Sequence, residues 1–499
     1  MRAVFEWMQL EALYSAEQTR ALDRCAIENH GISGAVLMSR AAATALDHLL
    51  LRWPHPLLLQ ILCGTGNNGG DGYLLADQAH KRGIPVQVWQ LGDAGKMRGD
   101  ALLARQQALA NGVAVAAFHP GALRAEGVLI DAMLGTGLTG EVRAPFSEAI
   151  TLCNQSGLPL LAVDIPSGLC ADTGRRLGAT TRADMTVTFI GYKRGLFTLD
   201  GPDCCGILVF ADLGVPAEVY RQSAPDWLRL DLDLLLAQLP SRPANAHKGN
   251  YGTVLVVGGD YGMGGAVALA AEAALRAGAG LVRVATRAEH VAAVIARTPE
   301  AMPVSVGSGQ ALKPLVDSAD VLVVGPGLGQ SPWSEQLVQT IAESGKPCVL
   351  DADGLNMLAA GRVLSPRVRD NWVFTPHPGE AARLLGCSTA QVQADRFAAT
   401  KRLQERLGGV VILKGNGSLV TDGTRGLLCD YGNPGMASGG MGDVLSGVIG
   451  GLLAQDLVGL DAAALAVCLH GAAADIASEQ GQKGLLAGDL MVPLRALLG

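Results

Sequence analysis

Apolar residues in the first half of the chain occur in short continuous runs, separated by stretches with helical spacing. Runs of this kind, without the alternation of a half-exposed strand, are typical of parallel strands covered by helices on both faces. They predict strands at residues 57–62, 86–91, 128–130, 160–163, 185–190 and 207–210. Helices are predicted at 15–29, with Ser15 as N-cap, and at 73–82 and 100–110. The first half is therefore predicted to be a doubly wound α/β domain.

This pattern lapses over residues 223–247, where three prolines interrupt a stretch without apolar periodicity. A second α/β series follows, with strands predicted at 253–257, 281–285, 321–324, 348–350, 372–374 and 410–413. The most apolar stretch, residues 444–470, contains two aspartates and several glycines. It predicts two buried helices rather than a membrane span. We therefore predict two domains, residues 1–225 and 226–499.

Composition narrows the class of protein. The net charge is −7 and there are no basic runs, which is unfavourable for a nucleic-acid or anionic-membrane partner. Hydrophobic residues make up 49% of the chain and charged residues 17%, enough for large buried cores. The ten cysteines are too sparse for a disulfide scaffold, and no signal-peptide pattern opens the chain. We expect a soluble cytoplasmic protein.

Glycine is over-represented, with 65 residues, and its densest run lies at residues 64–72, between a predicted strand and a predicted helix. Glycines there let backbone amides approach a phosphate at the helix N-terminus. The run formally matches the dinucleotide fingerprint. However, Asp71 would lie near the pyrophosphate, and no clear acid follows about 20 residues later. A dehydrogenase is therefore the weaker interpretation.

Two more predicted strands end in an aspartate followed by glycines, at residues 131–140 and 164–168. Loops at the carboxyl ends of parallel strands converge on one crevice. Asn68, Asp131 and Ser167 could therefore present hard oxygen ligands to one cation. Asp164 could act there as an acid or base. A lone aspartate at a strand end is more often a helix cap, but three such loops favour a site.

The second half carries a different glycine motif at residues 433–443, leading into an apolar helix. Its glycines predict an anion hole of backbone amides, with Asp443 placed to remove a hydroxyl proton beside a transferring phosphoryl group. No Walker P-loop is present. Residues 414–418 follow a predicted strand and could hold a phosphate or adenosine group. His377 stands between two prolines, in a fixed position from which it could contact substrate.

The motifs of the first half, together with Tyr192-Lys-Arg-Gly-Leu196, resemble the NAD(P)H-hydrate epimerase domain over residues 10–220. The resemblance implies a Rossmann-like three-layer domain with Asp164 as a catalytic residue. It implies that potassium is held by Asn68, Asp131 and Ser167. The hydrated nucleotide would be bound by Asn67, Asn68, Gly69, Gly70, Asp71, Gly135, Thr136, Gly137, Leu138, Thr139, Gly140, Glu141 and Asp164.

Five motifs of the second half, at residues 258–266, 325–329, 375–380, 414–418 and 433–443, resemble in order the ADP-dependent NAD(P)H-hydrate dehydratase domain, which has a ribokinase-like fold. The resemblance covers residues 230–499 and implies magnesium with the nucleotide. The hydrate would be contacted by Ala266, Gly327, His377 and the catalytic Asp443. ADP or AMP would be bound by Lys414, Gly415, Asn416, Gly417, Ser418 and Gly442.

The two resemblances together imply a bifunctional enzyme of nucleotide repair, expected to form a homo-oligomer. The first domain would interconvert the R and S hydrates of NADH and NADPH. The second would dehydrate the S form at the expense of ADP, giving AMP and phosphate. Two alternatives remain open: a ribokinase-type small-molecule kinase, and a first half that only binds nucleotide or a partner.

Overall fold

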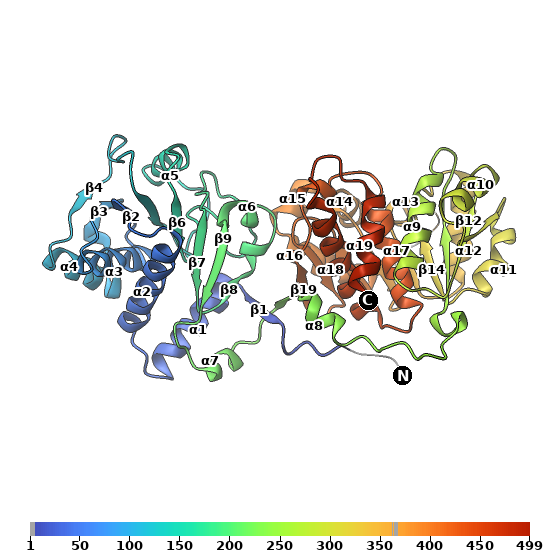
Figure 1. Ribbon diagram of the computed structural model, residues 1–499, viewed down its shortest axis with the longest axis horizontal. Helices are drawn as coiled ribbons and strands as arrows, with labels where there is room; N and C mark the ends of the chain where they lie inside the picture. The colour runs from blue at the N-terminus through green and yellow to red at the C-terminus, as the bar shows by residue number, and fades with distance from the viewer. Residues whose placement is uncertain (1–4, 362, 364–367) are drawn as a thin grey trace. The chain divides into compact units, whose positions relative to one another are not determined.

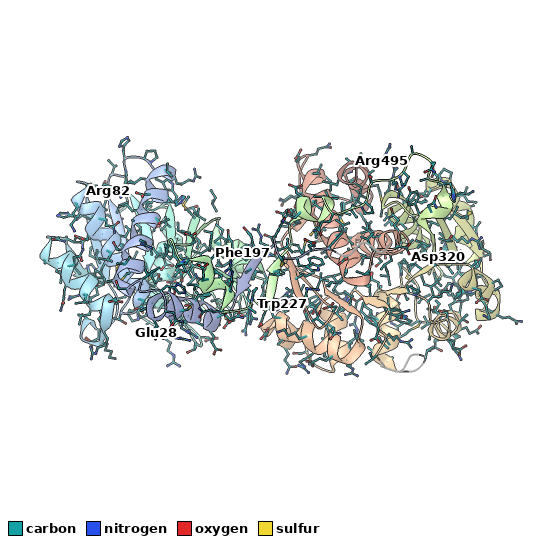
Figure 2. The ribbon with its side chains drawn as sticks, turned by 90° about the horizontal axis from the view of Figure 1, so that it is seen from below. Glu28, Arg82, Phe197, Trp227, Asp320 and Arg495 are labelled. Carbon is teal, nitrogen blue, oxygen red and sulfur yellow. The ribbon has the colours of Figure 1, made fainter. Side chains whose placement is uncertain are left out.

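The computed structural model describes residues 5–361, 363 and 368–499, and the described chain forms two compact units. The first unit is residues 12–227, and the second is residues 228–499 together with the N-terminal segment up to residue 11. Exposed charged side chains such as Glu28, Arg82 and Asp320 lie on the outside of the units (Figure 2).

The first unit is built on a seven-stranded sheet in the order β4-β3-β2-β5-β6-β7-β9, with every neighbouring pair parallel (Figure 1). Its strands are β2 (Leu59–Cys63), β3 (Val86–Gln90), β4 (Val115–Ala117), β5 (Val128–Ala132), β6 (Leu160–Val163), β7 (Met185–Phe189) and β9 (Ile207–Ala211). The order of strands reverses between β2 and β5. In a doubly wound sheet the ligand crevice lies outside the carboxyl ends of the strands at this reversal. The predicted doubly wound class is confirmed.

Helices cover both faces of this sheet. One apolar cluster joins α1 (Ala16–Glu28), α2 (Gly34–Arg52), α3 (Asn67–Lys81) and α4 (Gly99–Ala110) to one face of the strands. The other face packs against α5 (Phe146–Gln155) through Leu129 and Ile150. Ser15 caps α1 as predicted, in a capping box with Gln18. The unit also contains β1 (Glu11–Tyr14), β8 (Tyr192–Lys193), α6 (Gly201–Cys205) and α7 (Ala217–Arg221).

The second unit contains a parallel sheet in the order β13-β12-β11-β14-β15-β16-β17, extended by antiparallel β18 and β19. The strands are β11 (Thr253–Val257), β12 (Leu281–Thr286), β13 (Met302–Ser305), β14 (Val321–Val324), β15 (Cys348–Leu350), β16 (Trp372–Phe374), β17 (Val410–Leu413), β18 (Ser418–Thr421) and β19 (Gly426–Cys429). All six predicted strands of this half are present. The antiparallel pair and β13 were not predicted: β13 and β18 carry only short apolar runs, whereas β19 was missed although residues 427–429 form a continuous apolar run.

Helices α9 (Gly264–Arg276), α17 (Met441–Leu453) and α18 (Gly459–Ser478) form much of the core of the second unit. The others are α8 (Leu232–Leu236), α10 (Ala288–Arg297), α11 (Gly309–Asp317), α12 (Pro332–Glu343), α13 (Ala352–Ala360), α14 (Pro378–Leu385), α15 (Thr389–Ala394), α16 (Arg396–Leu407) and α19 (Met491–Leu497). Within the described chain, α18 is the one helix long and apolar enough to cross a membrane, and 83% of its apolar window is buried inside the protein. The stretch 444–470 thus contains two buried helices, as predicted.

The N-terminal segment corrects the expected assignment of residues 1–225 to the first domain. Phe5, Trp7 and Leu10 are buried in the apolar core of the second unit. The backbone N–H of Phe5 donates a hydrogen bond to Asp461 of α18 at 2.9 Å. These apolar residues stand too close to the end of the chain to form a periodic pattern, so the sequence did not show what they pack against. The segment thus completes the second unit from the opposite end of the chain.

Candidate active sites in the two units

A cavity of about 660 Å³ lies at the carboxyl ends of β2, β5 and β6 in the first unit, the position that the strand order predicts. Residues of α1 and α2 close its other side. The predicted binding residues that line it are Asn67, Asn68, Asp71, Gly135, Thr136, Gly137, Leu138, Thr139 and Asp164. The predicted residues Gly69, Gly70, Gly140 and Glu141 do not line it.

Gly69 and Gly70 lie behind the cavity lining, where their lack of a side chain allows close packing. Helix α3 begins at Asn67 rather than near residue 73, so both glycines lie in its first turns and are buried. A Cβ at Gly69 would lie 2.1 Å from the Gly64 carbonyl oxygen, and one at Gly70 would lie 2.7 Å from the Met38 sulfur. The glycines therefore allow α3 to pack closely beneath the cavity, with the helix N-terminus facing its floor.

Asp164 follows β6 in a left-handed backbone conformation with φ of 67°. Its carboxylate forms an ion pair with the Lys193 ammonium and accepts a hydrogen bond from the Phe189 N–H at 3.3 Å. Lys193 is 1% exposed and also donates to Thr188 Oγ1 at 3.0 Å and to the Phe189 carbonyl at 2.9 Å. Sequence reasoning missed Lys193, although it lies within the Tyr192–Leu196 motif.

Three further carboxyl groups line the same cavity, those of Asp71, Asp23 and Asp100. Burial raises the pKa of Asp71 well above its usual range, and Asp164 and Asp23 raise it further. Burial also raises the pKa of Asp23 to about 6, against the opposing charge of Lys193. The cavity therefore places carboxyl groups whose pKa is raised beside the ion-paired Asp164. Asp23 was also missed; its signal was an acid on the apolar face of the first predicted helix.

The predicted cation ligands are connected through neighbouring groups. Ser167 donates to Asp131 from its hydroxyl at 2.6 Å and from its backbone at 2.8 Å, and the Leu134 N–H donates to Ser167 Oγ at 2.8 Å. The next residue, Gly135, packs on Asn68: a Cβ there would lie 3.2 Å from Asn68 Cβ.

Asp131 is 1% exposed, burial raises its pKa, and no described basic side chain forms an ion pair with it. Both side-chain polar atoms of Asn68 are buried without a hydrogen-bond partner. A buried carboxylate lacking a counter-ion and an unpartnered amide oxygen are the donors that a hard monovalent cation requires. These residues fit potassium.

In the second unit the ammonium of Lys414 lies 2.7 Å from Asp351 Oδ1, and the Ser446 hydroxyl donates to Asp351 Oδ2 at 2.8 Å. Gly442, in the first turn of α17, lies against this pair, since a Cβ there would be 3.3 Å from Lys414 Nζ. The loop of residues 414–418, predicted to bind the nucleotide, and the predicted anion hole therefore meet at one point. Asp351 was missed, although it directly follows a predicted strand, as Asp131 and Asp164 do.

Three carboxyl groups surround Lys414. Burial raises the pKa of Asp443 to about 7, with Asp351 adding to the rise and Lys414 opposing it. Burial likewise raises the pKa of Glu380 to about 7. Burial alone would lower the pKa of Lys414, but Asp351, Glu380 and Asp443 raise it above its usual value. The site therefore combines the Lys414 cation with two carboxyl groups, those of Asp443 and Glu380, whose pKa burial raises to about 7.

His377 is the N-cap of α14, and its Nδ1 accepts a hydrogen bond from the Gly379 N–H at 2.9 Å. Burial and the charges of Lys414 and Arg383 lower its pKa. The imidazole is therefore neutral at physiological pH and held in one orientation. Glu380 lies one turn on and accepts from the His377 N–H at 2.8 Å.

Ala266 and Gly327 are neighbours, because a Cβ added to Gly327 would lie 3.0 Å from the Cβ of Ala266 and 2.6 Å from the Met263 carbonyl. Gly327 also has a φ of 55°. Both its left-handed backbone and the lack of space for a Cβ therefore require glycine at this position. No cluster of three or more His, Cys, Asp or Glu in the described chain is arranged to hold a metal ion.

Comparison with known proteins separates the same two parts of the chain. Residues 34–195 match the family model described as YjeF-related protein N-terminus, and residues 254–494 match that of NAD(P)H-hydrate dehydratase. The bifunctional NAD(P)H-hydrate repair enzyme Nnr of Coxiella burnetii is 48% identical over 491 residues, covering 98% of this chain and 100% of that protein. The Escherichia coli protein of the same name is 42% identical, with 97% and 94% covered.

Among solved structures, a ribokinase-like superfamily protein from Enterococcus faecalis is 30% identical with a TM-score of 0.51. The match covers 55% of this chain and 95% of that one. It corresponds to the predicted ribokinase-like fold of the second unit.

Proposed function

This chain belongs to the bifunctional NAD(P)H-hydrate repair enzymes, and on that premise we propose how its two units divide the chemistry. The unit of residues 12–227 epimerises the R and S hydrates of NADH and NADPH. The unit that contains residues 228–499 dehydrates the S hydrate with ADP as phosphoryl donor. The observation that carries this assignment is Asp443 in the first turn of α17, beside Lys414 and with its pKa raised to about 7 by burial.

Epimerisation requires the bond between the hydrated ring carbon and its oxygen to break and to form again on the opposite face. The leaving hydroxyl must gain a proton, and the returning water must lose one. Asp71, whose pKa burial raises, supplies the proton in the proposed reaction, and the ring nitrogen lone pair stabilises the cation left behind. Asp164, ion-paired to Lys193, accepts the proton of the returning water. Two carboxyls in different environments thus take opposite roles.

Potassium is assigned to Asn68, which lines the cavity, and to the hydrogen-bonded pair Asp131 and Ser167. When bound, the ion supplies a fixed positive charge close to the anionic substrate. The loop of residues 133–135 then joins the cation ligands to the cavity wall, because Leu134 and Gly135 contact Ser167 and Asn68 respectively. Cation binding is therefore expected to order this wall and to strengthen hydrate binding.

Dehydration is difficult because hydroxide is a poor leaving group. In the proposed reaction Asp443 removes the proton of the hydrate hydroxyl while the oxygen of that hydroxyl attacks the β-phosphorus of ADP. AMP leaves, and the phosphorylated hydrate then loses phosphate and a ring proton to give NAD(P)H. Lys414 and the amides at the start of α17 stabilise the charge on the phosphoryl oxygens in transfer. Ala266, Gly327 and His377 are assigned to the hydrate, and residues 414–418 and Gly442 to the nucleotide.

Magnesium is expected with the nucleotide, as the family resemblance implies. Ten free thiols, described without a disulfide, are consistent with the cytoplasmic location that we propose. We further propose that the protein forms a homo-oligomer and acts on small molecules alone.

The decisive experiment incubates the purified protein with mixed R and S hydrates, ADP and magnesium. Reduced nicotinamide should appear as absorbance near 340 nm, with AMP and phosphate formed in equal amounts. A small-molecule kinase would instead leave a stable phosphorylated product and no absorbance. Loss of the R hydrate as well as the S hydrate tests the epimerase, since a first unit that only bound nucleotide would leave the R form unchanged.

A further inference from the structure

Helix α16 begins with an arginine that lies directly beneath the Lys414–Ser418 loop. The side chain of Arg396 is 1% exposed. Its guanidinium donates to the backbone carbonyls of Leu413 at 3.3 Å, Lys414 at 3.4 Å and Gly417 at 3.1 Å, and to the Gln393 side chain at 3.2 Å. One residue therefore fixes both ends of the loop.

The loop is shaped around this side chain. Gly415 has a φ of 149°, and a Cβ added there would lie 2.4 Å from the nearest guanidinium nitrogen of Arg396. Gly415 and Asn416 are exposed on the outer side of the loop, while Arg396 is buried on the inner side. A peptide group is planar and trans, so its C=O and N–H point in opposite directions. When a carbonyl of the loop points inward to Arg396, its negative oxygen is therefore kept away from the outer side of the loop.

The charge of Arg396 is not compensated by an acid. Its polar partners in the described chain are three carbonyls and an amide oxygen, with no carboxylate in ion-pair range. Burial lowers its pKa to about 10, so the guanidinium still carries its proton at neutral pH. A buried cation without a counter-ion is costly unless something nearby uses its field.

We propose that Arg396 is the positioning residue of the adenine-nucleotide site: it fixes the Lys414–Ser418 loop from beneath and places an unpaired positive charge behind the bound anion. This inference rests on the proposed assignment of the loop to ADP. The same contacts set the backbone from which the Lys414 side chain reaches Asp351. Arg396 thus acts on the reaction through the loop, without touching substrate.

The test compares Arg396→Met, which removes both the charge and the set of N–H donors of the planar guanidinium (the fork), with Arg396→Lys, which keeps only the charge. We expect Arg396→Met to raise the KM for ADP at least about tenfold, the scale of lost hydrogen bonds from a charged group. The KM for the S hydrate should stay within about twofold, and Arg396→Lys should be intermediate. Thr400→Val is the matched control, because Thr400 is fully buried in α16 and its hydroxyl donates, among the described residues, to the Arg396 carbonyl alone, at 2.7 Å. It should lower thermal stability and leave the KM for ADP unchanged.

Two further variants separate failure of this inference from failure of the proposed site. If Asn416→Ala and Lys414→Met leave ADP binding unchanged, the loop is not the nucleotide site, and both the assignment and the inference are wrong. If these variants weaken ADP binding but Arg396→Met does not, the inference alone is wrong. It is equally wrong if Thr400→Val raises the KM for ADP as much as Arg396→Met. Should Arg396→Met not fold, calorimetric ADP binding to Arg396→Lys decides, and an unchanged affinity overturns the role of the fork.

Discussion

The ammonium of Lys193 forms an ion pair with the carboxylate of Asp164, and it does so from a side chain that is 1% exposed. Lys193 has two further acceptors, Thr188 Oγ1 and the Phe189 carbonyl, so its position is fixed independently of Asp164. The pair lines the same cavity as Asp71, which forms no ion pair with a described basic side chain; burial raises the pKa of Asp71 well above its usual range against the opposing charge of Lys193. This difference between two aspartates is the physical basis of the proposed acid–base division.

Asp164→Asn is expected to lower epimerisation by about 10²–10⁴-fold, because an amide cannot accept the proton. Lys193→Met should lower it as well, since it removes the cation that fixes the carboxylate. Chiral analysis of hydrate exchange measures the effect. Dehydration of pure S hydrate by the same preparations is the internal control and should not change. Normal epimerisation by Asp164→Asn would contradict the assigned role.

Asp131→Ala should differ in kind from Asp164→Asn. It removes the buried carboxylate of the proposed cation site, so hydrate binding should weaken and epimerisation should lose its dependence on potassium. Asp164→Asn should remain sensitive to potassium despite its low rate. A potassium titration of both variants, with sodium or lithium replacing the ion at constant ionic strength, measures this difference. An unchanged potassium response in Asp131→Ala would contradict the assignment of the potassium site to Asn68, Asp131 and Ser167.

The sequence predicted the strands that carry the two sites because continuous apolar runs followed by aspartate or glycine are strong local signals. It did not predict Lys193, Asp23 or Asp351, because the importance of each depends on neighbours from distant segments. The glycines of α3 show the same limit. A glycine-rich run after a strand predicts a phosphate loop, but only the packing of Gly70 against Met38 shows that the helix has already begun.

Asp443→Asn should lower dehydration by about 10²–10⁴-fold, since the isosteric amide cannot act as a base. Because burial raises the pKa of Asp443 to about 7, the wild-type rate should rise as pH increases through 7, and the variant should lose that rise. Single-turnover rates from pH 5.5 to 8.5 (about three units across the midpoint) measure this. Near-normal turnover in Asp443→Asn would contradict the mechanism.

Ionisation of the buried Asp443 should also lower the stability of the folded protein. An aspartate titrates near 3.9 in the unfolded chain, whereas Asp443 titrates at about 7 in the folded one. Between these values the folded state binds more protons, so stability falls as pH rises from about 4 to 7. Asp443→Asn removes this penalty and should raise the free energy of unfolding at pH 8 (well above the folded pKa) but not at pH 4. Denaturant unfolding at the two pH values checks it.

Trp7→Ala should destabilise the second unit, although Trp7 lies near the N-terminus and most of that unit is formed by residues 228–499. Trp7 is 6% exposed in the core of the second unit, and truncating a buried tryptophan costs about 3–5 kcal/mol. Heating the full-length protein should therefore abolish dehydration at a lower temperature in the variant, while epimerisation keeps its wild-type inactivation temperature. Met8→Ala is the matched control, because Met8 is 94% exposed beside Trp7 and its loss should change neither temperature. An earlier loss of epimerisation, with dehydration unaffected, would place the N-terminal segment in the first unit after all.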